Sequence, residues 1–176
     1  MYKIIKRIFI AIYNRIIIIY NPALYAKRVG VKMGTGVKFY AARPGMFGSE
    51  PWMITLGDDV HITAGVNFIT HDGGVLVLRK KYPKLEITKP IIIQNNVFIG
   101  INSIILPGVK VGNNVVIGSG SIVSKDIPDN VVVAGVPAKI IKTLDEYLHK
   151  TSSESLGFGN LDASSKEKAI KQFYGL

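Results

Sequence analysis

The chain has 176 residues, 48% of them apolar, and its 22 basic against 12 acidic residues give a formal net charge of +10. It contains no cysteine, which excludes a disulfide framework, a thiol nucleophile and thiolate metal ligands. The positive charge suits a nucleic acid, a membrane surface or a phosphorylated ligand as partner. Because no recognition-helix or RNA-binding signature is present, we expect no nucleic-acid partner.

Residues 1–28 predict a helical cap. The apolar stretch at residues 2–20 is stopped by Asn21-Pro22, and no small-residue cleavage site follows it. Its apolar runs are far shorter than the roughly 20 residues needed to cross a bilayer. The polar residues that interrupt them are Lys3, Lys6, Arg7, Asn14 and Arg15. Two uses remain open: the helix either packs against the domain that follows or lies in the interface of an anionic membrane. The apolar side chains concerned are Ile8, Phe9, Ile12, Ile16 and Ile19.

Branched aliphatic residues recur every six positions in the middle of the chain, a period that fits neither a helix nor an ordinary sheet. The register consists of Ile87, Ile93, Ile99, Ile105, Val111, Ile117 and Val123. A second set of apolar or small residues lies four positions after each: Ile91, Val97, Ser103, Val109, Val115, Ser121 and Ile127. Gly100, Gly112 and Gly118 follow three of the aliphatics, and the pattern also occurs upstream at Leu56, Ile62 and Phe68.

Hexapeptide repeats of this kind stack coil on coil, so that each coil buries its aliphatic residues against the next. Three repeats make one triangular turn. Residues eighteen apart, such as Ile93 with Val111 or Ile99 with Ile117, should therefore lie on neighbouring strands about 4.8 Å apart. The sequence predicts a mainly β fold, a left-handed parallel β-helix over residues 29–142.

The six-residue period fails between Phe68 and Ile87, which predicts a loop at residues 72–86 extruded from the coil. The loop is entered through Gly73 and Gly74, and it carries Arg79, Lys80, Lys81 and Lys84. Loops of this length in compact domains are usually functional or disordered, although a tolerated insertion remains an alternative.

The end of the chain predicts a helical tail over residues 143–176. We expect a short helix at about 144–150, a Ser/Gly-rich linker at 151–160 and a terminal helix at about 165–174. The linker is polar, and we find no catalytic motif in it.

Of the three histidines, His71 is the candidate for catalysis. It stands where the repeat breaks, at the mouth of the loop, so a rigid coil would hold it beneath a cover, which suits a general base. A structural histidine bonded to its own loop remains the alternative. His61 lies inside a hexapeptide and His149 in the tail, and neither position suggests chemistry.

Residues 90–142 resemble the hexapeptide-repeat acetyltransferases, and most of all the maltose and galactoside O-acetyltransferases and their capsule-polysaccharide relatives. The motifs that carry the resemblance are Asn96-Val97-Phe98-Ile99-Gly100, Leu106-Pro107-Gly108-Val109, the run from Ile117 to Pro128, and Ala134-Gly135-Val136-Pro137-Ala138-Lys139.

The resemblance implies a homotrimer with acetyl-CoA as co-substrate and with active sites in the grooves between neighbouring subunits. His71 matches the family's catalytic histidine in placement. The backbone beside Ile101 and Ser119 would line the pantetheine arm, and Ser124 and Lys125 would flank it. Lys139 and Lys142 would face the CoA phosphates, although they could also be ordinary exposed lysines.

The acceptor side departs from the sugar acetyltransferases, so its residues are predicted from this chain alone. Glu50 could bond an acceptor hydroxyl, orient His71 across the subunit groove, or only cap a turn. Trp52 could stack on a sugar ring, or lie in the core or an interface. Asn67, four residues before the histidine, is a third candidate for binding the acceptor.

We expect direct acetyl transfer to a hydroxyl of a sugar, polysaccharide or glycan precursor, with neutral His71 as general base and no metal. An N-acetyltransferase acting on an amino sugar nucleotide shares every motif and is the main alternative. A γ-type carbonic anhydrase would need three converging imidazoles, which the histidine positions do not suggest. A non-catalytic, membrane-associated scaffold trimer is a further alternative. We expect a cytoplasmic location, with peripheral contact at the inner face of the membrane left open.

Overall fold

The computed structural model describes residues 2–176, without the side chains of residues 2–4, 7 and 8. By its contacts the chain forms two compact units, the first reaching Leu144 and the second comprising Asp145–Leu176. The repeat region belongs to the first unit.

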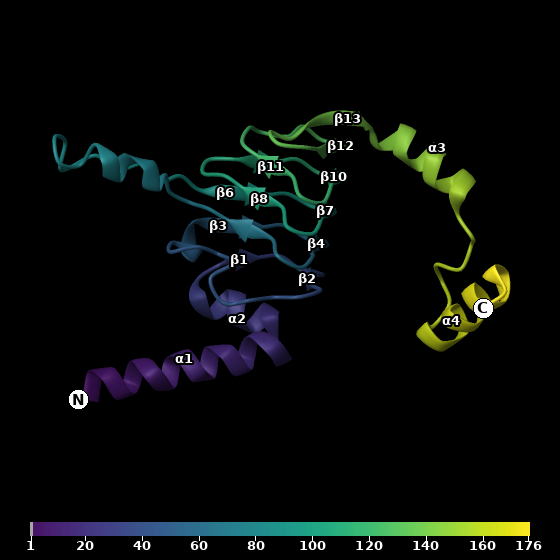
Figure 1. Cartoon of the computed structure of the whole chain (residues 1–176), viewed down its shortest axis with the longest axis horizontal. Coiled ribbons are helices and arrows are strands. Elements are labelled where there is room, and N and C mark those ends of the chain that lie inside the picture. Colours follow the sequence, from purple (N-terminus) through teal and green to yellow (C-terminus); the bar gives the residue numbers. More distant parts are fainter. Residues whose placement is uncertain (1) are drawn as a thin grey trace. The chain divides into compact units, whose positions relative to one another are not determined.

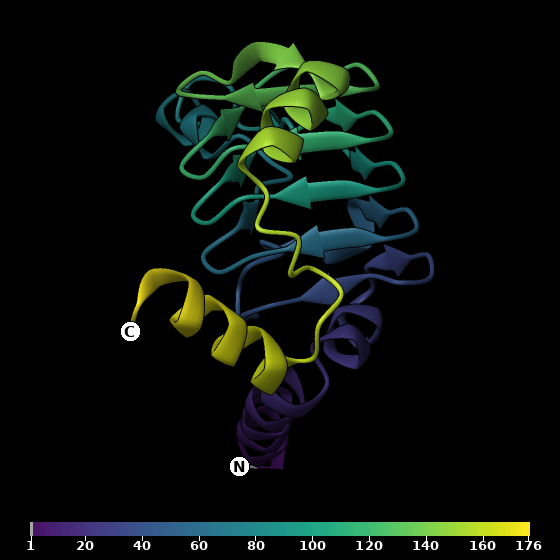
Figure 2. The same cartoon turned by 90° about the vertical axis from the view of Figure 1, so that its right-hand side faces the viewer.

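The repeat region is a stack of coils whose short strands form three sheets within the described residues (Figures 1 and 2). The first sheet contains β1 (Lys32–Met33), β3 (Ile54–Leu56), β6 (Ile91–Ile93) and β9 (Lys110–Val111). The second contains β2 (Lys38–Phe39), β4 (Val60–Ile62), β7 (Val97–Ile99), β10 (Val115–Ile117), β12 (Val131–Ala134) and β13 (Lys139–Thr143). The third contains β5 (Asn67–Phe68), β8 (Ile104–Ile105) and β11 (Ile122–Val123).

The strands pair in parallel in the predicted register. Ile93 is the partner of Val111, and Ile99 is the partner of Ile117. Only β13 runs antiparallel to its neighbour β12, and it closes the stack among the described residues. This arrangement confirms the parallel coil and fits the left-handed β-helix that the six-residue period predicts.

The core consists of the aliphatic residues that the period identified. From Ile93 to Val123 every member of the six-residue register is at most 1% exposed. The small members of the second set, Ser103 and Ser121, are also buried, and both hydroxyl groups donate to the Gly118 carbonyl oxygen. Ile87 is the exception: it is 37% exposed, because it belongs to the returning end of the projecting loop and not to a coil.

The coil corners explain the glycines that follow the aliphatic positions. A Cβ at Gly100 would lie 2.5 Å from the Ser119 backbone nitrogen, and one at Gly112 would lie 2.7 Å from that of Asp129. A neighbouring coil therefore approaches too closely for any side chain. At another corner Asp59, Asn96, Asn114 and Asn130 adopt positive φ, which Asn and Asp tolerate best after glycine. The amide of Asn114 joins its neighbours in this column, since it accepts from Asn96 at 2.8 Å and donates to Asn130 at 2.9 Å.

The N-terminal segment forms two helices where the sequence predicts one. Helix α1 (Tyr2–Tyr20) ends before Asn21-Pro22, and α2 (Pro22–Val29) begins there. The Asn21 side chain accepts a hydrogen bond from the Leu24 N–H at 2.9 Å, Pro22 occupies the first turn, and Gly30 ends α2 with φ of 110°. Asn and Pro at these positions cap the start of a new helix, but the same two residues also fit the end of the preceding one. Tyr25 and Ala26 of α2 are buried, and α2 contacts β1 and β2, so α2 is the helix that covers the first coil.

The segment between β5 and β6 projects from the coil stack (Figure 1). Its two ends pair as an antiparallel bridge between His71 and Thr88, with the Lys89 N–H donating to the Thr70 carbonyl at 2.8 Å. A 3₁₀ helix (Gly73–Val77) begins where the Asp72 carboxylate accepts from the Gly74 N–H. The projecting segment is thus tied to the coil at His71.

The second unit contains α3 (Leu144–Glu154), whose first residue belongs to the first unit, and α4 (Ala163–Tyr174). Helix α3 runs four residues past the predicted end, through Thr151, Ser152 and Ser153 of the predicted linker. Helix α4 starts two residues early, because Asp162 caps it by accepting from the N–H groups of Ser164 and Ser165. Hydrogen bonds with the side chain and the backbone N–H of Ser165, and then with Ser164, lower the pKa of Asp162 to about 2.

Candidate active site

His71 is held by a carboxylate from an earlier segment. Its Nδ1 lies 2.8 Å from Oε2 of Glu50, and the buried Thr70 hydroxyl donates to the same oxygen at 2.6 Å. The segment before Glu50 is fixed by Met46 and Phe47, which are buried. The Phe68 N–H donates to the Met46 carbonyl at 2.8 Å, and the rings of Phe47 and Phe68 stack. The site is therefore built on packed core residues.

The electrostatics of this pair favour one tautomer of the histidine. The hydrogen bond from Thr70, then that with His71, holds the pKa of Glu50 below its usual value, against the opposing effect of desolvation. An ionised carboxylate only accepts hydrogen bonds, so the hydrogen-bond network assigns the proton of neutral His71 to Nδ1. Nε2 is then left with a lone pair, as a general base requires.

Two hollows meet at His71. The larger, about 550 Å³, is lined by Ile69, His71, Asp72, Gly73, Ile87, Lys89, Leu106, Pro107 and Ser124. The smaller, about 270 Å³, is lined by Ser49, Glu50, His71, Asp72, Gly73, Val75, Leu76, Arg79 and Glu86. We call them the apolar hollow and the polar hollow. The histidine can therefore reach ligands from two sides.

The residues predicted for CoA are spread along the coil. Ser124 lines the apolar hollow with His71. Ile101 and Ser119 occupy the same corner of successive coils, where the Gly120 N–H donates to the Ile101 carbonyl at 2.7 Å. Lys125 is exposed. Lys139 and Lys142 share the closing strand β13, where Lys139 is exposed and Lys142 half-buried.

The structure places the acceptor candidates Glu50 and Trp52 in different surroundings. Glu50 contacts His71 of its own chain, so an orienting role does not need a subunit groove, and its side chain makes no capping bond to the 3₁₀ turn (Pro51–Met53) that follows it. Trp52 is 60% exposed, which excludes the core interpretation, and it lines neither hollow.

Asn67 has a structural use. Its Oδ1 accepts from Arg43 at 2.6 Å and its Nδ2 donates to the Gly65 carbonyl at 2.8 Å. It lines neither of the two hollows at His71. The amide thus ties the segment before Glu50 to the coil.

The other histidines stand apart from this site. His61 on β4 contacts the Tyr40 hydroxyl through Nδ1 at 2.8 Å and stacks on that ring. His149 is exposed on α3. In the described part of the chain, no three His, Asp or Glu side chains group as metal ligands.

Several site residues escaped the sequence analysis. Thr70 was overlooked because its hydroxyl meets Glu50 only in the folded chain. Ile87 was overlooked because it continues the six-residue register of core residues. Asp72, Arg79 and Glu86 belong to the loop, where no period indicates which side chains turn toward the coil. Arg79 forms an ion pair with Glu86 and donates from Nε to the Leu85 carbonyl at 3.1 Å. The position of Asp72 directly after His71 was the one available signal.

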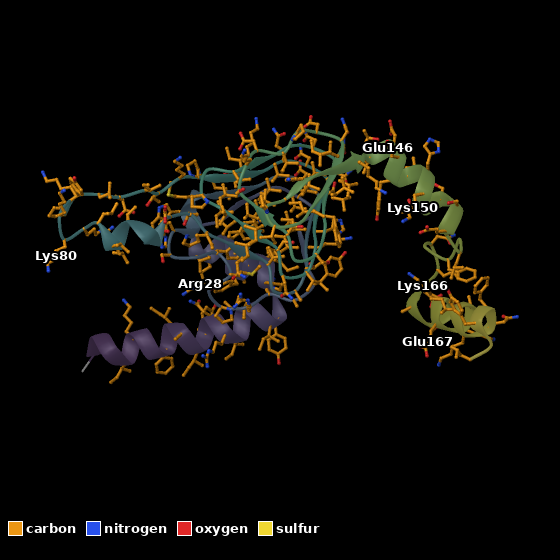
Figure 3. The ribbon with its side chains drawn as sticks, turned by 45° about the horizontal axis from the view of Figure 1, so that its top comes forward. Arg28, Lys80, Glu146, Lys150, Lys166 and Glu167 are labelled. Carbon is orange, nitrogen blue, oxygen red and sulfur yellow. The ribbon has the colours of Figure 1, made fainter. Side chains whose placement is uncertain are left out.

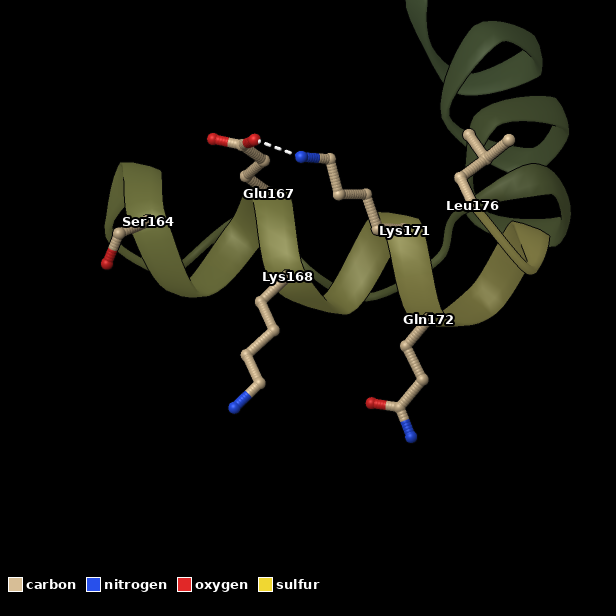
Figure 4. A pocket seen from close by; sticks show the side chains of 6 residues that line it. All are labelled: Ser164, Glu167, Lys168, Lys171, Gln172 and Leu176. Carbon is tan, nitrogen blue, oxygen red and sulfur yellow. Dashed lines mark hydrogen bonds and ion pairs between the residues drawn. The ribbon is translucent and has the colours of Figure 1, made fainter.

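A further hollow lies on α4 of the second unit (Figure 4). It is lined by side chains of one exposed helix and the last residue, and it contains the ion pair of Lys171 with Glu167 at 2.6 Å. Pairs spaced by four residues are common on solvated helices. All six lining residues are exposed to solvent, so we assign no site to this hollow.

Known proteins share the repeat. A family profile described as bacterial transferase hexapeptide (six repeats) matches residues 90–125. Galactoside O-acetyltransferase of Escherichia coli is 44% identical over 98 residues, 55% of this chain and 47% of that protein. Protein CapG of Staphylococcus aureus is 55% identical over 121 residues, 69% of this chain and 70% of CapG. The chain belongs to the hexapeptide-repeat acetyltransferases.

Solved structures of two acetyltransferases with the same repeat resemble this chain. A hexapeptide-repeat containing acetyltransferase from Vibrio cholerae superposes with a TM-score of 0.51 and 30% identity, covering 65% of this chain and 63% of that chain. Serine O-acetyltransferase from Brucella melitensis gives 0.51 and 31%, over 65% of this chain and 39% of that one. The chain spans about half the length of the E. coli galactoside O-acetyltransferase that it matches.

Proposed function

We propose that this acetyltransferase moves the acetyl group of acetyl-CoA to a hydroxyl of a sugar or glycan precursor. The observation that carries the proposal is the contact of His71 Nδ1 with Glu50, which leaves Nε2 available where an apolar and a polar hollow meet. The names of two relatives, galactoside O-acetyltransferases of E. coli and Lactococcus lactis, support the sugar hydroxyl.

The reaction proceeds by direct transfer. Nε2 of neutral His71 takes the proton of the acceptor hydroxyl while that oxygen bonds to the thioester carbonyl carbon. Backbone N–H groups of the coil stabilise the negative oxygen that forms. The carbon–sulfur bond then breaks, and the CoA thiolate takes the proton back from the imidazolium. The Glu50 carboxylate orients the ring and offsets its transient positive charge.

The donor enters through the apolar hollow. Its aliphatic lining and Ser124 suit the acetyl and pantetheine end of CoA. The corner at Ile101 and Ser119 continues the path along the coil, flanked by Lys125. Lys139 and Lys142 meet the phosphates, since ammonium groups pair with them through charge-assisted hydrogen bonds.

The acceptor occupies the polar hollow. Glu50 binds Thr70 and His71 through one carboxylate oxygen, Oε2, and the residue also lines this hollow. Asp72, Arg79 and Glu86 add further polar groups to the lining. Carboxylates and a guanidinium together can bond several neighbouring hydroxyl groups, as a sugar ring presents them. Trp52 and Asn67 remain outside this binding site.

A homotrimer would complete the site between neighbouring coils. Ile92 and Phe98, on the outer sides of β6 and β7, are about 40% exposed in the single chain, and outward apolar side chains of this kind suit a subunit contact. The assembly itself rests on the resemblance to the family.

An amine acceptor is the second candidate. The N-acetyltransferase of 2,3,4,5-tetrahydropyridine-2,6-dicarboxylate from Clostridium perfringens is 56% identical over 57 residues, 24% of that protein. The carboxylates of the polar hollow would also suit an ammonium group, although only a neutral amine is nucleophilic.

A screen of paired acceptors tests the function. Sugars, oligosaccharides and the corresponding amino sugars are incubated with acetyl-CoA, and mass spectrometry detects a gained acetyl group. We expect hydroxyl acetylation, which mild alkali removes because esters hydrolyse far faster than amides. Alkali-stable products on amino sugars alone would assign the enzyme to N-acetylation.

A further inference from the structure

Helix α1 exposes an apolar stripe that the first unit does not cover. Ile5, Phe9, Ile12, Ile16 and Ile19 follow one another at intervals of four and three residues, and all are between 49% and 75% exposed. That spacing places them on one face of the helix. The side chain of Ile8, also predicted for this face, lies outside the described residues.

The stripe faces away from the rest of the first unit. Among the side chains of α1 that the structure describes, Ile17 and Ile18 are the buried ones, and they belong to the core of the first unit. Each residue rotates the helix by about 100°, so Ile18 lies nearly opposite the centre of the stripe. Figure 1 shows α1 at the end of the first unit, and the positions of Ile17 and Ile18 place the stripe on the side of this helix that faces away from that unit.

Positive charge surrounds the stripe. The exposed Lys6 and Arg15 border it on its two sides, and exposed Lys27 and Arg28 follow on α2. Arg28, labelled in Figure 3, is held beside α1 by Asn14 at 3.3 Å and lies over the ring of Tyr13 at 4.8 Å. The sequence has no acidic residue before Glu50. The side chains of Lys3 and Arg7 lie outside the described residues.

This combination identifies the partner. Symmetric pairing of α1 with a second copy would bring cations against cations with no carboxylate to offset them. Exposed Tyr13 and Tyr20 suit the boundary between headgroups and acyl chains. No helix among the described residues is long and apolar enough to cross a bilayer. We propose that α1 lies flat in the interface of an anionic membrane, with its stripe in the acyl boundary and its cations at the headgroups.

Vesicle co-sedimentation of the full chain tests this proposal. We expect binding to vesicles of equal parts phosphatidylcholine and phosphatidylglycerol at about 0.1 M salt, and strong loss of binding near 1 M, where the Debye length falls to about 3 Å. Lys6→Gln and Arg15→Gln should each weaken binding about five-fold, because each cation near an anionic surface contributes about 1 kcal/mol.

The apolar contribution is tested with a matched pair of double variants. Phe9→Ser with Ile16→Ser should lower vesicle binding at least ten-fold. Leu148→Ser with Phe173→Ser removes equally exposed side chains from α3 and α4 and should leave binding unchanged. Circular dichroism and elution volume should be the same for both variants and the wild type.

Three results would overturn the proposal. They are full-length protein that ignores anionic vesicles, equal binding to phosphatidylcholine alone, and dissociation of an oligomer by the Phe9 and Ile16 changes without any vesicle binding by the wild type. The last would make the stripe a contact between copies. None of these measurements depends on acetyl transfer, so failure of the proposed function would leave the test intact.

Discussion

At the scale of single residues, the site depends on one carboxylate with two neighbours. The same oxygen of the Glu50 carboxylate accepts a hydrogen bond from the hydroxyl of buried Thr70 and contacts Nδ1 of His71. Glu50 is thus a positioning residue for the histidine as well as part of the acceptor hollow. The Glu50 carboxylate is ionised across the neutral range, since a glutamate is ordinarily ionised there and the hydrogen bonds from Thr70 and His71 lower its pKa further.

Glu50→Gln should lower kcat at least about ten-fold while leaving the KM for acetyl-CoA unchanged. A factor of ten corresponds to a change of about one pKa unit in the stabilisation of the charged imidazolium. The amide keeps the shape but loses the charge that offsets the imidazolium. Steady-state kinetics with a fixed acceptor measures both constants. Glu167→Gln on α4 is the control and should be fully active. Unchanged kcat in the Glu50 variant would remove its positioning role.

A structural readout accompanies the kinetics. Since folding lowers the pKa of Glu50, its hydrogen bonds stabilise the fold above the unfolded value of about 4.3, and this contribution is lost as the pH falls through the lowered folded value. Urea unfolding should therefore show Glu50→Gln destabilised relative to wild type at pH 7, with a difference that shrinks in acid below about pH 4.

At the scale of elements, regular strands could be predicted and the irregular ones could not. The six-residue period identifies β6 to β11 because each of these strands ends on the buried aliphatic residue of one repeat. Helix α2 was missed because Asn21-Pro22 is both a stop for α1 and a start for α2. Ile87 was misassigned because chance kept the register across the loop, whereas the structure places it beside Thr88, the partner of His71 in an isolated bridge outside the coil.

The closing strand β13 has a testable role in our proposal. Lys139→Ala and Lys142→Ala should each weaken CoA binding about ten-fold, while a pantetheine thioester without phosphates binds equally to variant and wild type. Titration calorimetry with both ligands measures the difference. Lys38→Ala, on β2 of the same sheet, is the matched control. Equal losses for both ligands would show that these lysines do not recognise phosphate.

At the scale of the whole molecule, the sequence predicted the coil, its register and the histidine at its break, because repetition makes each of them a local signal. The partner of the histidine came from tertiary packing: Met46 and Phe47 bury themselves against Phe68 and carry Glu50 to His71. No periodicity identifies such a contact. The exposed face of α1 could not be predicted either, because the spacing of apolar residues along a helix does not show which side the rest of the protein covers.

The central claim is that His71 is the base for acetyl transfer. The most direct measurement compares the single-turnover rate of acetyl transfer in wild type, His71→Ala and His61→Ala, with acetyl-CoA binding measured in parallel. His71→Ala should lose about 10²- to 10⁴-fold in rate with nearly unchanged acetyl-CoA affinity, and His61→Ala should stay active. A His71→Ala enzyme that transfers acetyl groups within a few-fold of the wild-type rate would contradict the account.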